Sequence, residues 1–325
     1  MKSLKFIDLF CGIGGFRIAF EQAASEHNIE TECVFSSDID KYAQDSYFAN
    51  FGERPFGDIT QIDESNIPDH DILFAGFPCQ AFSIIGNRGG FEDTRGTLFF
   101  DVARIIKKKR PTSFILENVK QLRGHDKGKT LKTILSTLKE LGYYVDFKVL
   151  NALDFGLPQK RERIVIVGHR DPIFFSFPQK VESYKPLSAI LEAESEVDPK
   201  FFASDYIVEK RMNSHISNHS PSIWHENKSG NISSYPYSCA LRAGASYNYL
   251  LVNGKRRLTP REMLRLQGFP DTYKIAVSDS QLRKQAGNSV PVTMIKAVIL
   301  KLLPFIAESV STTMVLREPQ LQHKK

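Results

Sequence analysis

Hydrophobic and polar positions follow an alternating pattern along the first half of the chain. Up to about residue 168, short runs rich in β-branched and aromatic residues are separated by amphipathic stretches such as TLKTILSTLKELG. The short runs are KFIDLF, ECVFSSD, DILFAGF, SFILENV and RIVIVG. Strand-like runs that alternate with helices of this kind are typical of a parallel sheet with helices on both faces. The pattern therefore predicts a doubly wound α/β domain.

The alternation disappears between residues 169 and 256. Ser, Asn, His, Tyr and Pro become frequent there, as in SHISNHSPSIWHENKSGNISSYPYS. A structureless loop of this length is unusual in a compact protein. A second, smaller and irregular domain is therefore the favoured interpretation, and a long insertion that decorates the first domain is the alternative.

Regular structure returns at RLTPREMLRLQGFP. Thr259 is a candidate N-cap, Pro260 occupies the first helical position, and Glu262 completes a capping box, so a helix is predicted to start here. The run VPVTMIKAVILKLL predicts a second helix after Pro291. Both helices are expected to pack on the first domain. Residues 1–168 and 257–325 would then form one domain, with residues 169–256 inserted into it.

Composition adds limits to this picture. The chain has 325 residues, 42% of them hydrophobic, and a formal charge of +6, which fits an anionic partner such as nucleic acid but also a solvated lysine-rich surface. The four cysteines form no C-x-x-C pair, so neither a zinc site nor a disulfide framework is indicated, and a reducing cytoplasmic setting fits best. No signal peptide or membrane span is expected.

Candidate binding residues lie where the predicted strands end, because ligands of open α/β sheets bind beyond the carboxyl ends of the strands. The first run ends in DLFCGIGGF, whose Gly12, Gly14 and Gly15 permit a tight turn close to a ligand. A dinucleotide fingerprint would need glycine where this chain has Arg17, which argues against NAD or FAD. Asp38, at the end of the second run, is placed either to accept hydrogen bonds from a ribose or to cap a helix. Together these features favour a nucleoside ligand.

Candidate reactive residues follow the next two runs. Cys79 comes directly after Pro78 and before a glycine-rich stretch, a setting that suits a nucleophilic thiolate, whereas the other three cysteines are expected in the core. Glu117 ends the SFIL run on the same sheet edge, as a candidate acid or as a charge at a helix start. Arg161 and Arg163, two residues apart in an extended stretch, are expected to project to one face. Surface salt bridges are the alternative for both arginines.

Eight blocks now match one family in order. They are DLFCGIGG, SSDID, GDIT, GFPCQAFS, ENV, QKRER, RLTPREMLRLQGFP and QAGNSVPV. The series closely resembles the motifs of the DNA (cytosine-5)-methyltransferases, and the compact size resembles the bacterial restriction–modification type. The resemblance implies a Rossmann-like S-adenosyl-L-methionine-dependent domain with a small, irregular β-rich target-recognition domain inserted at residues 169–256.

The resemblance also implies a mechanism. The target cytosine of double-stranded DNA is flipped out of the helix, and the Cys79 thiolate adds to ring carbon 6. Glu117 contacts ring nitrogen 3 and the exocyclic amine, Arg161 holds the base carbonyl, and Arg163 supports the site. Carbon 5 then takes the methyl group of S-adenosyl-L-methionine.

The same resemblance assigns binding residues. The methionine part of the cofactor lies over the glycine-rich turn, the ribose on Asp38, and the adenine near Ile39, where the family often has an aromatic residue. The cofactor set is Phe10, Gly12, Gly14, Gly15, Asp38, Ile39, Asp58, Ile59, Pro78, Leu98, Asn288 and Val290. The predicted DNA contacts are Gln80, Ser83, Arg88, Ser238, Arg242, Arg256 and Arg257. In SCALRAGASYNYLL the usual Thr-Leu pair is Ala240-Leu241, which weakens any transfer of recognition contacts.

Two rival functions stay open from the sequence. One branch of the family modifies transfer RNA, so an RNA cytosine-5 methyltransferase is the nearest rival. A catalytically inactive DNA-binding regulator is the second, and the intact Cys79, Glu117 and Arg161 argue against it. The expected partners are DNA and a cognate restriction endonuclease that acts on the same site without stable association. A monomer suffices, and no metal or membrane is expected.

Overall fold

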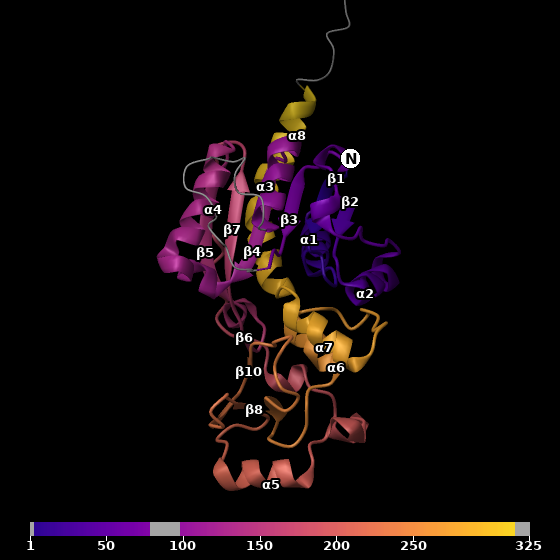
Figure 1. Cartoon of the computed structure of the whole chain (residues 1–325), viewed down its shortest axis with the longest axis vertical. Helices are drawn as coiled ribbons and strands as arrows, with labels where there is room; N and C mark the ends of the chain where they lie inside the picture. Colours follow the sequence, from indigo (N-terminus) through magenta and orange to yellow (C-terminus); the bar gives the residue numbers. More distant parts are fainter. Residues whose placement is uncertain (1–2, 79–97, 316–325) are drawn as a thin grey trace, which may run out of the picture.

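A six-stranded sheet forms the centre of the larger lobe (Figure 1). The structure, a computed structural model, describes residues 3–78 and 98–315, with side chains as far as residue 309. The strand order is β2-β1-β3-β4-β7-β5. The strands are β1 (Leu4–Leu9), β2 (Thr31–Ser37), β3 (Ile72–Ala75), β4 (Ser113–Val119), β5 (Tyr144–Asn151) and β7 (Glu162–His169).

Strand direction confirms the parallel prediction for four strands and corrects it for one. β1 pairs in parallel with β2 and β3, and β3 with β4, but β7 is antiparallel to both β4 and β5. The link from β5 to β7 contains one turn of 3-10 helix (Ala152–Phe155) and the two-residue strand β6 (Gln159–Lys160). Neighbouring parallel strands need a long crossover, whereas antiparallel strands accept such a short link. The RIVIVG run therefore enters the sheet in the opposite direction.

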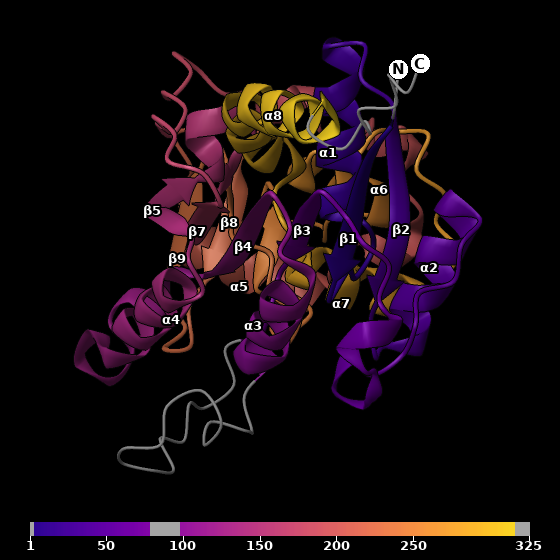
Figure 2. The same ribbon diagram turned by 90° about the horizontal axis from the view of Figure 1, so that it is seen from above.

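Helices cover both faces of the sheet (Figure 2). α1 (Gly15–Glu26) and α8 (Val292–Val315) lie on one face, and α3 (Leu98–Lys109) and α4 (Lys129–Glu140) on the other, while α2 (Lys41–Phe51) follows β2. Successive strand side chains enter opposite cores. Phe6 and Phe74 pack with α1 and α8, whereas Ile7 and Leu73 pack with α3 and α4. Burial on both faces explains why the strands read as nearly continuous hydrophobic runs.

One apolar segment reaches the dimensions of a membrane span, contrary to the sequence prediction. Residues Asp279–Ser309 are long and apolar enough by length and composition, with 56% of the window buried inside the protein. Ile295, Ile299 and Leu302 are fully buried in the core that α8 shares with α1. A helix buried in a protein core can have the same length and hydropathy as a membrane span, and the burial of α8 matches such a core helix.

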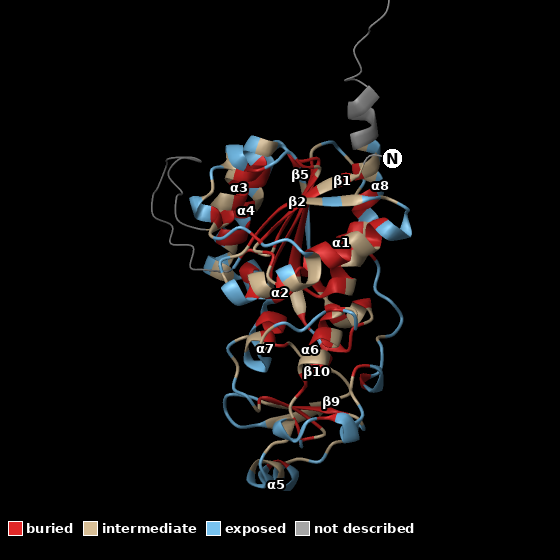
Figure 3. Cartoon of the chain, turned by 90° about the vertical axis from the view of Figure 1, so that its right-hand side faces the viewer, coloured by how far each residue is buried: buried red, intermediate tan, exposed pale blue. Residues whose placement is uncertain are grey.

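The second lobe contains more regular structure than its composition suggested. It holds α5 (Asp205–Ser214) and a three-stranded sheet in the order β11-β8-β9, formed by Leu250–Val252, Ile223–Glu226 and Ile232–Tyr235. β10 (Ser238–Cys239) pairs in parallel with β6 and so joins this lobe to the larger one. Figure 3 shows a mostly buried central sheet and a mostly exposed α5 at the far end of the second lobe.

α6 (Pro260–Gln267) and α7 (Asp279–Asn288) lie between the lobes. Leu264 and Leu282 belong to the core of the larger lobe, whereas Met263, Leu266 and Ala286 pack with the second lobe. The two cores therefore meet on these helices, and the division at residues 168/169 and 256/257 stays a prediction. The capping box of α6 is confirmed.

A buried carboxyl in β1 makes the stability of the fold depend on pH. Asp8 is fully buried, and neither of its carboxylate oxygens has a hydrogen-bond partner of good geometry. Burial raises the pKa of Asp8 from 3.8 to about 8, although the nearby Arg17 charge opposes this shift. The folded chain therefore holds a proton that the unfolded chain releases at much lower pH.

We expect Asp8→Asn to flatten the pH dependence of unfolding. Because the folded-state pKa is raised, the Asp8 contribution to stability is greatest below pH 3.8 and is lost as the pH rises to about 8. The wild type should lose on the order of 3 kcal/mol more than the variant between pH 5 and pH 8. Urea unfolding at both pH values measures this difference. Asp69→Asn, at a side chain that is 94% exposed, is the control; parallel curves for wild type and Asp8→Asn would refute the assignment.

Candidate active site

A cavity of about 600 Å³ opens where β1, β2, β3 and β4 end. The turn after β1, the residues after β2 and the ends of β3 and β4 line it, and residues 284–290, from α7 onward, close one side. This is the sheet edge at which the sequence placed its candidate residues. The open α/β sheet thus brings side chains from distant parts of the chain to one hollow.

The glycine-rich turn is packed closely from two sides. Gly14 has a φ of +79°, and a Cβ there would lie 2.3 Å from the Phe51 ring. A Cβ on Gly15 would lie 2.8 Å from the Cγ2 atom of Val290. Phe10, at the start of the turn, also has a positive φ, of 54°, which residues other than glycine rarely adopt. Close packing thus holds the turn against the cavity in a conformation that larger side chains would prevent.

Asp38 connects the first two strand ends. Its Oδ2 atom accepts a hydrogen bond from the Gly12 amide at 2.8 Å, and its Oδ1 atom accepts one from the Asp40 amide at 2.8 Å. Burial raises the pKa of Asp38. Asp40, not Asp38, caps α2, so the capping alternative does not apply to Asp38. Each of its oxygens retains a lone pair for a ligand.

The predicted cofactor residues gather at the cavity with one exception. Gly14 is not among the lining residues, and its role is the packing described above. Ile39 lines the cavity with 72% of its surface exposed. The predicted residues that line it are Phe10, Gly12, Gly15, Asp38, Ile39, Asp58, Ile59, Pro78, Leu98, Asn288 and Val290.

Further lining residues were given no role from the sequence. Phe16, Thr60, Lys284 and Ser289 also line the cavity. The Nζ atom of Lys284 lies 2.6 Å from the Oδ2 atom of Asp40, across the mouth between α7 and α2. Ser289 lies inside the QAGNSVPV block, so the motif already contained that signal. Lys284 precedes the block, and only the folded chain brings it to Asp40, in the turn after β2.

Glu117 and Arg163, which both line the cavity, form an ion pair whose side chains are largely buried. The Nε atom of Arg163 lies 2.7 Å from the Oε1 atom of Glu117. Burial raises the pKa of Glu117, and the charges of Arg163 and Arg161 oppose this shift. A carboxyl with a raised pKa beside a fixed guanidinium suits proton donation to a polar ring.

Asn118 positions the chain that leads to the predicted nucleophile. Its Nδ2 atom donates a hydrogen bond to the Phe77 carbonyl at 2.8 Å. Phe77 and Pro78 line the cavity, and Cys79 follows Pro78 directly in the sequence. Asn118 belongs to the ENV block, but no role was predicted for it. The predicted residues Cys79, Gln80, Ser83 and Arg88 lie outside the described residues.

The two arginines of QKRER are separated in the structure, contrary to the expectation that they project to one face. Arg163 lies within β7 and reaches Glu117, whereas Arg161 precedes β7, so strand alternation does not relate the two side chains. Arg161 does not line the cavity. Its side chain is 1% exposed and donates to backbone carbonyls instead. The prediction gave the base carbonyl to Arg161 and a supporting role to Arg163, but Arg163 is the arginine that lies beside Glu117 and lines the cavity.

Two predicted DNA contacts are corrected by their burial. Ser238 is fully buried, and its hydroxyl donates to the Cys239 carbonyl at 2.7 Å. Arg256 is buried and makes two hydrogen bonds to Glu262, at 2.8 and 2.9 Å, which place it in the support of α6. Neither side chain is accessible to DNA in this arrangement.

The other two arginines of the second lobe that were predicted to contact DNA lie nearer the surface. The Arg242 guanidinium is exposed and lies 4.8 Å from the centre of the Tyr249 ring. Arg257 is partly exposed and lies 5.8 Å from the centre of the Tyr247 ring. Both remain accessible to a phosphate or a base edge.

The described cysteines fit a structural role. Burial raises the pKa of the Cys11 thiol and raises that of Cys33 to about 12, so both thiols stay protonated at neutral pH. Within residues 3–78 and 98–309, no group of three or more His, Cys, Asp or Glu side chains is arranged to hold a metal ion.

Known proteins resemble this chain over almost its full length. A family model described as C-5 cytosine-specific DNA methylase matches residues 4–303. The type II methyltransferase M.NgoBI of Neisseria gonorrhoeae is 60% identical over 294 residues, which cover 90% of this chain and 91% of that protein. The type II methyltransferase M.HaeII of Haemophilus aegyptius is 58% identical over 299 residues, or 92% of each chain.

Solved structures share the fold. The methyltransferase EhMeth of Entamoeba histolytica aligns with a TM-score of 0.71 at 18% identity and covers 95% of this chain and 99% of its own. The Dnmt2 methyltransferase of S. pombe aligns with a TM-score of 0.70 at 20% identity, covering 94% and 99%. At such identities the likeness concerns the fold, which is the Rossmann-like methyltransferase fold. With the family match over residues 4–303, these comparisons lead to one conclusion: the chain belongs to the C-5 cytosine-specific DNA methylase family.

Proposed function

We propose that the chain is a type II DNA methyltransferase that methylates carbon 5 of cytosine within a short DNA sequence. It would act as a monomer in the bacterial cytoplasm and protect DNA from a cognate restriction endonuclease that cuts the same site without stable association. Two relatives named type II methyltransferases, at 60% and 58% identity, support this proposal. The observation that carries it is one cavity that joins Asp38, the Glu117–Arg163 pair and the residue before Cys79.

The cavity fits S-adenosyl-L-methionine by its size and donor set. Asp38 keeps acceptor capacity for ribose hydroxyls, and the turn from Phe10 to Gly15 offers close backbone approach for the amino-acid end. Ile39 and Ile59 offer apolar surface for the adenine. When bound, the cofactor supplies an electrophilic methyl group. The chain's own residues hold it and place the target base.

The chemistry of the protein side chains would proceed on a cytosine flipped out of the duplex. The Cys79 thiolate forms a bond to ring carbon 6, and the displaced electron pair makes carbon 5 nucleophilic. Glu117 would donate its proton toward ring nitrogen 3 and accept a hydrogen bond from the exocyclic amine, which matches the donor pattern of cytosine. After carbon 5 is methylated, it loses its proton to water, the freed electron pair restores the ring double bond, and the carbon–sulfur bond breaks. Ring nitrogen 3 returns its proton to Glu117, so the thiolate and the acid are both restored.

Arg163 is the arginine that we now place at the base. Its guanidinium holds Glu117 at 2.7 Å and lines the cavity, so the same group can orient the carboxyl and reach the base carbonyl. Arg161 lacks this access. We propose that the second lobe recognises DNA, and we call it the recognition lobe. For the duplex, Arg242 and Arg257 remain our proposed contacts in this lobe, together with Gln80, Ser83 and Arg88.

The substrate is tested by methyl transfer from labelled S-adenosyl-L-methionine to unmethylated plasmid DNA and, separately, to transfer RNA. We expect label in DNA alone, as 5-methylcytosine within one short sequence. Label in RNA alone would show that the substrate is RNA and that the proposed methylation chemistry still applies. Cofactor binding without transfer to either nucleic acid would favour the inactive DNA-binding regulator. Mapping the labelled base by sequencing also supplies the recognition site.

A further inference from the structure

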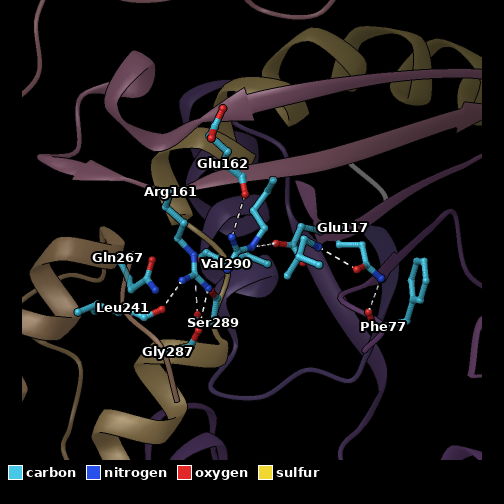
Figure 4. Close-up of polar contacts among 12 residues, drawn as sticks. Phe77, Glu117, Arg161, Glu162, Leu241, Gln267, Gly287, Ser289 and Val290 are labelled. Carbon is cyan, nitrogen blue, oxygen red and sulfur yellow. Dashed lines mark hydrogen bonds and ion pairs between the residues drawn. The ribbon is translucent and has the colours of Figure 1, made fainter. Parts of the chain in front are cut away.

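One buried guanidinium joins the recognition lobe to the cofactor cavity (Figure 4). The Nη1 atom of Arg161 donates to the Leu241 carbonyl at 2.8 Å. The Nη2 atom donates to the Gly287 carbonyl at 2.9 Å and to the Ser289 carbonyl at 2.7 Å. Leu241 follows β10 in the recognition lobe, whereas Gly287 and Ser289 line the cavity. A single side chain therefore holds backbone from both places.

A second buried side chain holds the same recognition residue. The Oε1 atom of Gln159 accepts a hydrogen bond from the Leu241 amide at 3.0 Å, and its Nε2 atom donates to the Leu266 carbonyl at 2.9 Å. Gln267 extends the network by donating to the Ala286 carbonyl at 2.5 Å. Both backbone polar groups of Leu241 are thus satisfied from one short stretch, residues 159–161, beside the active-site strand β7.

The contact between the two segments is also sterically tight. A Cβ added to Gly287 would lie 2.4 Å from the Ala243 amide nitrogen and 2.8 Å from the Arg242 carbonyl carbon. The recognition segment after Leu241 therefore rests directly on the cavity-lining segment. Close-packed elements of this kind transmit displacements instead of absorbing them.

The cost of burying Arg161 indicates that it does more than support the fold. Among the described residues, no carboxylate forms an ion pair with Arg161, and its Nε atom has no hydrogen-bond partner. A buried charge without a direct ion-pair partner is expensive, and the Glu117 carboxylate acts on Arg161 only from beyond ion-pair distance. Its planar guanidinium, however, fixes the relative positions of three carbonyl groups, which the ammonium group of a flexible lysine side chain cannot do.

We propose that Arg161 couples binding of DNA in the recognition lobe to binding of the cofactor, because displacement of the Leu241 segment changes the geometry of the Gly287–Ser289 segment. This inference rests on the proposed function. Coupling between two ligands is reciprocal: if DNA raises cofactor affinity by some factor, the cofactor raises DNA affinity by the same factor. Arg161 is then a positioning residue, and its effect is visible as an interaction between two binding equilibria.

The coupling is measured with S-adenosyl-L-homocysteine, a non-reacting cofactor analogue, and a short duplex carrying the mapped site. In the wild type we expect each ligand to tighten the other by about tenfold. Arg161→Lys keeps a positive charge but loses the planar guanidinium. In this variant we expect the factor by which each ligand tightens the other to fall to about one. Weakening of both ligands with the factor retained would show that Arg161 is only structural, and would overturn the inference.

Arg211→Lys is the matched control. Arg211 is also buried and donates to a backbone carbonyl of the recognition lobe, at Asn248, and to Glu226. Within the part of the chain that the structure describes, its hydrogen-bond and ion-pair partners do not include the cavity-lining segment. We expect this variant to alter DNA affinity while the coupling factor stays at the wild-type value. Loss of coupling in both variants would assign the effect to general loosening of the lobe.

A measurement on the wild type covers the case in which Arg161→Lys fails to fold. Amide hydrogen exchange of the segment from Leu241 to Ala245 is followed with and without S-adenosyl-L-homocysteine, in the absence of DNA. We expect the analogue to slow exchange in this segment, which lies outside the cavity lining. Unchanged exchange with saturating analogue overturns the coupling alone. Failure of the analogue to bind would count against the proposed function itself.

Discussion

A chain carrying Cys79→Ser is expected to methylate DNA more slowly by a factor of about 10⁴ or more, because the variant cannot form the covalent adduct that activates the cytosine ring. An aromatic ring carbon at position 5 of cytosine has little nucleophilic character until a thiolate adds at carbon 6. A serine hydroxyl is not ionised at neutral pH, and so does not replace the thiolate. Single-turnover transfer of labelled methyl groups to DNA measures the loss.

The control for this variant is a second cysteine substitution. Cys239 lies partly exposed in β10, away from the cavity lining, and Cys239→Ser is expected to keep the wild-type rate. Cys79→Ser should also bind S-adenosyl-L-homocysteine as the wild type does, because Asp38 and the turn after β1 remain intact. A Cys79→Ser enzyme with a tenth or more of the wild-type rate would exclude Cys79 as the nucleophile.

The cavity was predictable because it depends on strand order more than on exact packing. Each hydrophobic run ends at the same sheet edge when neighbouring strands are parallel, so Phe10, Asp38, Pro78 and Glu117 had to converge if the sheet formed. The start of α6 was also predictable. Thr259, the following proline and a glutamate three residues after Thr259 specify a helix start without tertiary information.

The errors lie where a side chain's role depends on one residue of register or on a distant partner. β7 begins at Glu162, so Arg163 obeys strand alternation and Arg161 does not. The buried pairing of Arg256 with Glu262 depends on the path of the chain between them, and from sequence alone two adjacent arginines suggest a phosphate-binding patch. Likewise, the direction of β7 depends on the absence of a crossover helix between β5 and β7, which its RIVIVG run does not reveal.

Glu117→Gln is expected to lower the rate of the chemical step by a factor of about 10² to 10³, the range for loss of a positioned proton donor. Glutamine has nearly the same shape and still offers one donor and one acceptor to cytosine. It cannot deliver a proton, and it leaves the Arg163 charge buried without its partner, which lies at 2.7 Å in the wild type. Base binding should therefore change less than the rate.

Glu162→Gln provides the matched control on the next strand. Glu162 forms an ion pair with Lys120 at 2.8 Å and does not line the cavity, so the variant is expected to keep the wild-type rate. An equal loss of rate in both variants would assign the effect to disturbance of the strand pair β4 and β7. A wild-type rate in Glu117→Gln would leave the carboxyl as a structural partner of Arg163 only.

The pH dependence of the methylation rate distinguishes proton donation by Glu117 from the effect of its ion pair with Arg163. Because burial raises the pKa of Glu117, the protonated form that can donate to ring nitrogen 3 persists to higher pH than in an exposed glutamate. The wild-type rate should fall as the pH rises through this raised pKa, while the thiolate population of Cys79 rises in the opposite sense. Glu117→Gln has no proton to lose at this position, so its rate should lack the falling limb. If the falling limb persists in Glu117→Gln, another group supplies the proton, and Glu117 acts on the base through charge and hydrogen bonding alone.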